Sequence, residues 1–141
     1  MKNNIKKFSF IILSAVIISS CSKDKNSPTS PNLEHDQALI GTWVLTQITS
    51  PIVTTPEALG ISLTAVFSSD GKTSLTTVEL DSTTTDSGTW GTSDGKITIT
   101  LEGEDPVTSS YSVNGNTATI NQYPVNFQGA LILASLEFTK Q

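Results

Sequence analysis

The sequence contains no arginine, one cysteine and one histidine. Zinc sites need several cysteine, histidine or acidic ligands, and the common hydrolase sites need a base beside a serine or cysteine nucleophile. The single histidine, His35, lies in a polar segment, where we expect a solvated linker residue. The sequence therefore predicts no metal, no cofactor and no enzymatic activity.

Basic residues are few in the part of the chain that follows Cys21. Five lysines stand there against thirteen acidic residues, which gives a net charge of about −8. Nucleic-acid affinity comes largely from lysine and arginine side chains that neutralise phosphates, so this balance argues against DNA or RNA as a partner. An anionic lipid surface would repel the domain for the same reason.

Two groups of carboxylates remain as candidates for chemistry. Glu79 and Asp81 could share one face of a strand, as an acid–base pair requires. Glu102, Glu104 and Asp105 form an acidic turn whose oxygens would suit a weakly bound Ca²⁺. Both groups border polar loops, so we expect solvated side chains without a catalytic role or a bound ion.

Residues 1–20 have the organisation of a secretory signal peptide. Three lysines precede an apolar run from Phe8 to Ile18. A membrane-spanning helix needs about 20 apolar residues, so this run is too short to span a bilayer and fits a secretory core instead.

The sequence Ile18-Ser19-Ser20-Cys21 resembles the lipobox of bacterial lipoproteins. The resemblance implies cleavage before Cys21 and attachment of acyl chains, such as palmitate, to that residue. Two or three acyl chains would hold the protein stably at a membrane. The alternative is an ordinary signal peptide with an incidental cysteine.

Residues 21–37 are expected to form the lipidated cysteine and a flexible tether, because the segment is polar, contains two prolines and has too little apolar area to order itself. Lipoproteins retained in the inner membrane commonly carry an acidic residue directly after the cysteine, and Ser22 is not acidic. The resemblance therefore favours the outer membrane of the cell envelope, with the periplasmic and the surface face both open.

Residues 38–141 show apolar residues that alternate with period two, which is typical of half-buried strands. We expect about eight strands, at residues 39–49, 61–69, 72–80, 88–92, 96–102, 107–113, 116–122 and 130–140. Asp70-Gly71, Asp94-Gly95 and Asn114-Gly115 predict tight hairpin turns. Residues 50–60, 81–87 and 123–129 are expected to be loops, the first with one helical turn near Pro56.

Consecutive hairpins build an antiparallel up-and-down meander, whose open edges would invite aggregation unless the sheet closes. Eight strands can close into a small barrel. The sequence therefore predicts an all-β fold in which about eight antiparallel strands form a barrel. A two-sheet sandwich is the alternative, although its crossing connections would be longer than most of the connections here.

Several short motifs follow one another in an order similar to that of the small lipocalin-like domains of Bacteroidetes lipoproteins. They are Gly41-Thr42-Trp43, the hairpin sequence Phe67–Gly71, a second Gly-x-Trp at residues 88–90 and an apolar last strand. The resemblance implies that Gly41 and Trp43 belong to the closed end of a lipocalin-like barrel, where a late arginine stacks on the tryptophan. This chain has no arginine, so Lys140 is predicted to be the cation–π partner of Trp43.

The resemblance also implies a membrane-anchored protein that binds a small apolar or amphipathic ligand in the envelope. The candidate ligand contacts are aromatic residues of the mature domain, for each of which core packing is the alternative: Phe67, Trp90, Tyr111, Tyr123 and Phe127. The alternative function is that of a non-catalytic interaction protein with a filled barrel that contacts another envelope protein.

Overall fold

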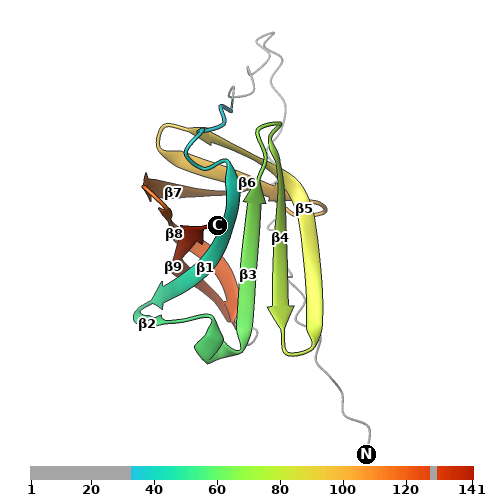
Figure 1. Ribbon diagram of the computed structural model, residues 1–141, viewed down its shortest axis with the longest axis vertical. Helices are drawn as coiled ribbons and strands as arrows, with labels where there is room; N and C mark the ends of the chain where they lie inside the picture. The colour runs from blue at the N-terminus through green and yellow to red at the C-terminus, as the bar shows by residue number, and fades with distance from the viewer. Residues whose placement is uncertain (1–32, 128–129) are drawn as a thin grey trace, which may run out of the picture.

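The computed structural model describes residues 33–127 and 130–141, which form one antiparallel sheet rolled into a barrel (Figure 1). The elements are β1 (Gly41–Ser50), β2 (Ile52–Thr54), the 3-10 turn η1 (Glu57–Leu59), β3 (Ile61–Phe67), β4 (Lys72–Glu79), β5 (Ser82–Ser93), β6 (Lys96–Leu101), β7 (Val107–Asn114), β8 (Thr117–Phe127) and β9 (Ala130–Lys140). In the described part of the chain, no helix is long and apolar enough to cross a bilayer. The predicted signal peptide, Cys21 and the tether up to residue 32 lie outside the described residues.

Pairing between the first and the last long strand closes the barrel. Each strand from β3 to β9 is antiparallel to its neighbour in sequence, and β9 pairs back onto β1, while β2 is a short addition at the end of β1. Across the closure, Leu45 lies opposite Phe138 and Ile48 opposite Leu136. The structure confirms the predicted closed barrel of eight antiparallel strands.

Each of the three predicted hairpins has its own turn geometry. Asp94 and Gly95 both have positive φ angles, of 51° and 70°, as a two-residue type I′ turn requires. The first hairpin has a three-residue loop instead, because the Ser68 N–H donates to the Lys72 carbonyl and Gly71 takes a φ of 80°. In the third, Asn114 pairs with Thr117, so the turn lies one residue later than predicted.

Three segments that were predicted to be loops contain strands. In the predicted loop 50–60, Ile52–Thr54 forms β2, which pairs with the end of β1, ahead of the 3-10 turn η1. Residues 82–87 form the first half of β5, because the chain already reverses at Leu80-Asp81, where Glu79 pairs with Ser82. Leu80 has a φ of 52°, which leucine rarely adopts, so the composition of this turn gave no signal. Residues 123–127 continue β8 opposite β9, beyond a register shift between Ile120 and Tyr123.

The buried side chains concentrate where β1 begins and β9 ends, here called the Trp43 end. The buried apolar residues are Leu39, Trp43, Leu45, Ala65, Phe67, Trp90, Ile97, Ile99, Ala118, Ile120, Tyr123, Ala134, Leu136 and Phe138. The opposite end, here called the β2 end, carries β2, η1 and the turn between β4 and β5 (Figure 1). The first half of β5, which leads away from that turn, is exposed on both of its faces.

Candidate functional site

Trp43 fills the interior of the barrel at the Trp43 end, where β1 begins and β9 ends. Its side chain is fully buried, and its indole N–H donates to the Leu39 carbonyl at 2.7 Å. The Lys140 ammonium lies 5.2 Å from the centroid of the Trp43 ring and donates to the Ala38 carbonyl at 3.3 Å. Gly41 leaves space for this lysine, since a Cβ there would come within 2.8 Å of Lys140 Cε. The three residues form one packed unit.

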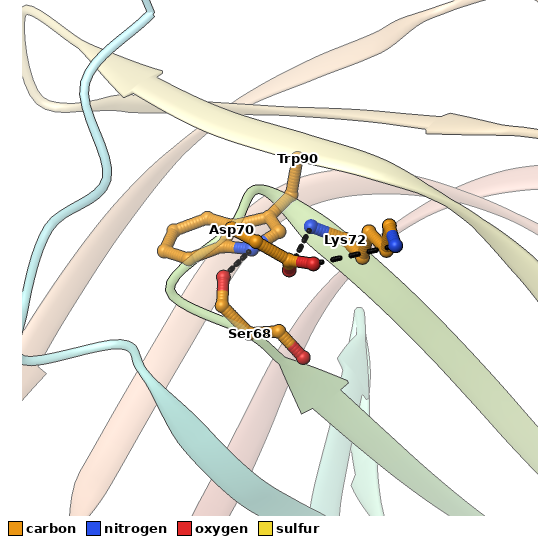
Figure 2. Close-up of polar contacts among 4 residues, drawn as sticks. All are labelled: Ser68, Asp70, Lys72 and Trp90. Carbon is orange, nitrogen blue, oxygen red and sulfur yellow. Dashed lines mark hydrogen bonds and ion pairs between the residues drawn. The ribbon is translucent and has the colours of Figure 1, made fainter.

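Trp90 and Phe67 pack against each other with ring centroids 5.1 Å apart, and both are nearly inaccessible to solvent. The Trp90 indole N–H donates to the Ser68 carbonyl at 2.9 Å. Figure 2 shows this bond beside the exposed ion pair between Asp70 and Lys72 in the hairpin that joins β3 to β4. The Lys72 backbone N–H holds the pKa of the Asp70 carboxyl below its usual value. Trp90 and Phe67 are therefore core residues in this structure.

Residues 33–37, here called the strap, lie against the barrel, although the sequence suggested a flexible tether. Glu34 and Thr92 exchange two backbone hydrogen bonds, Glu34 N–H to Thr92 O at 3.0 Å and Thr92 N–H to Glu34 O at 2.6 Å. The Thr92 hydroxyl donates to the Glu34 carbonyl and accepts from the Asp36 N–H. The strap therefore continues the line of β4 beside the last residues of β5.

His35 is a packed residue of the strap, so the expectation of a solvated linker histidine was wrong. Its ring meets the Trp90 ring edge-on at 5.1 Å, and its Nε2–H donates to the Trp90 carbonyl at 3.2 Å. The ring also lies over Gly71, where a Cβ would come within 2.6 Å of Nε2. Sequence reasoning missed this contact because a single ring on an irregular segment leaves no periodic signal.

Tyr111 joins the strap to β7. Its hydroxyl donates to Asp36 Oδ2 at 2.7 Å, and partial burial together with this bond raises its pKa to about 12. A polar surface hollow of about 310 Å³ adjoins the pair and is lined by Glu34, His35, Asp36, Thr92, Ser93, Asp94, Gly95 and Tyr111. Of the predicted ligand contacts, Tyr111 alone borders this hollow.

Tyr123 lies on β8, away from the strap. Its ring is buried, and that burial, with a smaller effect of the Glu104 charge, raises the pKa of its hydroxyl to about 12. The backbone of Phe127 ends β8, and its side chain lies outside the described part of the structure. The structure thus packs Phe67 against Trp90 and places Tyr111 and Tyr123 elsewhere, so the four described aromatic candidates do not surround one cavity.

The inner wall of the barrel is less completely buried toward the β2 end. Strand register directs Ile61, Leu63, Val125 and Ile132 inward, and all four remain partly accessible. On the facing strands, the inward positions toward the β2 end are mostly polar and include Thr84 and Asp86, with Leu75 on β4 as an apolar exception. This half of the barrel therefore presents an apolar wall on β3, β8 and β9 and a mostly polar wall on β4 and β5.

A second hollow, of about 670 Å³, lies over β4, β5 and β6 and the turn that follows β6. It is lined by Ser68, Lys72, Thr73, Ser74, Ser87, Gly88, Thr89, Thr100, Leu101, Glu102, Gly103 and Glu104. Six of these twelve residues are serine or threonine. Gly88 matters here, because a Cβ at this position would overlap the Thr100 carbonyl, so its absence lets β5 and β6 approach closely.

The two predicted groups of carboxylates lie on different connections of the fold. Glu79 ends β4 and Asp81 lies in the turn, while Glu102, Glu104 and Asp105 belong to the connection between β6 and β7. Partial burial and the nearby Asp86 carboxylate raise the pKa of Glu104. Across residues 33–127 and 130–141, no three His, Cys, Asp or Glu side chains gather in a way that could hold a metal ion.

Comparison with known protein families finds a match to the family described as lipocalin-like domain, over residues 39–120. The matched region begins just before β1 and ends within β8, so it covers the barrel wall apart from the end of β8 and β9. No curated protein and no solved structure matches the chain.

Proposed function

The chain belongs to the family of lipocalin-like domains, and we propose that it is a lipid-anchored, non-catalytic protein of the bacterial envelope that holds a small apolar or amphipathic molecule. The observation that carries the proposal is the partly accessible inner wall toward the β2 end. A ligand site of this kind is concave and mostly apolar, with a few polar groups that fix orientation. The apolar side chains of β3, β8 and β9 opposite the polar side chains of β4 and β5 suit an amphipathic molecule.

The place where the strap meets the barrel determines how an anchor at Cys21 would orient the domain. The strap meets the barrel beside Thr92, at the Trp43 end. Acyl chains on Cys21 would therefore pull on the filled end of the barrel and leave the β2 end directed away from the membrane. The intact mass of protein isolated from its own envelope tests whether Cys21 carries acyl chains. We expect a mass increase equal to the acyl groups, which Cys21→Ser abolishes.

Binding of a small molecule can be tested with a neutral solvatochromic dye, Nile red, and with native mass spectrometry of protein from its own envelope. Ile132→Trp would fill the inner wall, whereas the neighbouring Leu133→Trp adds the same ring to the outer face, where Leu133 is 59% exposed. We expect the first variant to lose dye binding and any co-purifying mass, and the second to keep both. Equal behaviour of the two variants would contradict an internal site.

A second candidate function is contact with another envelope protein, and a specific observation favours it. Large apolar side chains are exposed on or near the β2 end: Ile52, Val53, Val78, Leu80, Leu131 and Leu133. Exposed apolar groups of this extent commonly mark interaction surfaces. An empty barrel that co-purifies with a protein, and loses it in Leu131→Ser with Leu133→Ser, would support this function over ligand binding.

A further inference from the structure

Strand β5 is twice as long as the strand beside it, with 12 residues against 6 in β6. Strand β6 pairs with β5 only from Gly88 to Ser93. The first half of β5, Ser82–Ser87, pairs along its length with β4 on the other side. Among the described residues, this half of β5 therefore has one neighbouring strand and one unpaired edge, here called the β5 edge.

The register shows which backbone groups point out from the β5 edge. Glu79 and Ser82 flank a two-residue turn and so bond to each other, which leaves the alternate residues Thr83, Thr85 and Ser87 directed away from β4. Ser87 follows this rule, because its carbonyl accepts a hydrogen bond from the Glu102 N–H at 2.9 Å. The N–H and C=O groups of Thr83 and Thr85 therefore face the position that a further strand would occupy.

The β5 edge has few of the devices that usually protect an exposed strand. Protected edges carry lysine, proline, a bulge or inward-pointing charges, whereas Ser82–Ser87 reads STTTDS, pairs with β4 without a register shift and has one charge, Asp86. Threonine favours extended backbone. At the end of this edge, Leu80 is 85% exposed with a φ of 52°, so a strained turn presents an apolar side chain to solvent.

Charge around the β5 edge is predominantly negative. The carboxylates near the β2 end and on the connection after β6 are Glu57, Glu79, Asp81, Asp86, Glu102, Glu104 and Asp105. The lysines of the described residues, Lys72, Lys96 and Lys140, all lie toward the Trp43 end. A second copy paired edge to edge would bring two such acidic surfaces together, which like-charge repulsion disfavours. A basic partner is complementary to this surface.

We propose that the β5 edge receives an extended segment of a partner protein, rich in lysine or arginine, as an additional antiparallel strand. Main-chain bonds to Thr83 and Thr85 supply the pairing, as in other cases of strand addition. Basic side chains of the added strand that point into the barrel lie near Asp86. A side chain at the end of the added strand contacts Leu80. This interaction goes beyond the ligand site proposed above, because it uses the backbone of one edge and requires no molecule inside the barrel.

The test uses the full-length chain and an acetylated, amidated peptide of eight residues in which lysine and valine alternate, with a matched peptide that has glutamate in place of lysine. Amide chemical shifts and hydrogen exchange are measured by NMR. We expect the lysine peptide to slow exchange at Thr83 and Thr85 by about tenfold or more at saturation, since both amides become hydrogen-bonded. The glutamate peptide should leave both amides unchanged.

Two variants separate edge pairing from general charge attraction. Thr85→Pro removes one outward N–H without removing a bond to β4 and should abolish binding, whereas Thr85→Val keeps the N–H and should bind normally. Asp86→Lys, at an exposed position, should weaken binding of the lysine peptide, because it replaces one attractive charge by a repulsive one. Equal binding of the two peptides, or binding that survives Thr85→Pro in a folded chain, would overturn the proposal. So would protection of Thr83 and Thr85 without peptide, which would indicate a second copy if it rises with concentration and the chain's own segment if it does not.

Discussion

The Lys140 ammonium lies 5.2 Å from the centre of the Trp43 ring and is hydrogen-bonded to the Ala38 carbonyl. One side chain therefore connects the last strand with the segment that enters the first strand, across the line where the barrel closes. A lysine here occupies the place that the lipocalin resemblance assigns to an arginine.

Lys140→Met tests the energy of this contact, because methionine keeps much of the chain length and removes the charge. We expect the free energy of unfolding to fall by about 0.5–2 kcal/mol, the range for a cation–π pair. Urea denaturation measures the change. The control is Lys96→Met beside the exposed turn at Asp94-Gly95, which should leave stability unchanged. If both variants have the same free energy of unfolding as the parent chain, the contact contributes nothing to stability.

Gly88→Ala tests the close approach of β5 to β6. A Cβ there would overlap the Thr100 carbonyl and lie 2.8 Å from Leu101 Cα, both backbone atoms. We expect a loss of about 1–3 kcal/mol in unfolding free energy, as for overpacked sites. Gly95→Asn is the matched control, since its Cβ would meet nothing within 4 Å and asparagine tolerates its φ of 70°. A Gly88→Ala variant as stable as Gly95→Asn would contradict this strand geometry.

Ser109 has a buried hydroxyl oxygen with no hydrogen-bond partner in the described structure. A buried polar group without a partner costs about 1–3 kcal/mol. Ser109→Ala should therefore raise the thermal midpoint, whereas Ser110→Ala, at the adjacent exposed position, should not. Calorimetry distinguishes the two variants. A lower midpoint for Ser109→Ala would mean that the hydroxyl is hydrogen-bonded in solution.

His35→Ala tests whether the strap covers Trp90 in solution. Loss of the imidazole removes the edge contact at 5.1 Å and the hydrogen bond to the Trp90 carbonyl. We expect acrylamide to quench tryptophan fluorescence more strongly in this variant, because Trp43 stays buried and Trp90 becomes accessible. His35→Phe should restore most of the protection, since a ring still covers Trp90. Equal quenching of all three chains would show that the strap is not held against the barrel.

Both tyrosines of the chain have a pKa raised to about 12 from the ordinary value of 10.0. A raised pKa means that the folded state holds the phenol proton more tightly than the unfolded state. Their contribution to stability is therefore complete below pH 10 and is lost as the pH rises toward 12. Ultraviolet titration should show tyrosinate forming near pH 12, and Tyr123→Phe should reduce the amplitude of that change by about half. Titration near pH 10 in a folded chain would contradict the burial of both rings.

The fold was predictable from the sequence where local chemistry and strand periodicity agree. Asp94-Gly95 stands between two alternating runs and forms the expected turn, and the last strand, Ala130–Lys140, has the predicted bounds. The prediction failed at Ser82–Ser87, because a strand exposed on both faces shows no apolar alternation. It also failed at Tyr123–Phe127, because Pro124 suggested a loop, although proline is tolerated on a strand with a neighbour on one side only.

The candidate site was harder to predict than the fold. Inward and outward positions follow from the alternation of apolar and polar residues. The degree of burial of an inward side chain depends on which side chains of other strands lie at the same level along the barrel axis. Ile97 is fully buried, whereas Leu63 stays partly accessible, although both face inward. Trp90 was placed between core and ligand contact because its cover, His35, comes from a segment with no regular pattern.

All three lysines of the described residues lie toward the Trp43 end, whereas seven carboxylates lie toward the β2 end and on the connection after β6, so the domain has an electric dipole along its long direction. Near a negatively charged surface, such a dipole experiences a torque that turns the less acidic end inward, and this torque weakens as salt screens the field. The end turned inward is the one where the strap meets the barrel. Electrostatic orientation and the attachment proposed at Cys21 would therefore act in the same sense, and the more acidic end would extend into the surrounding solution.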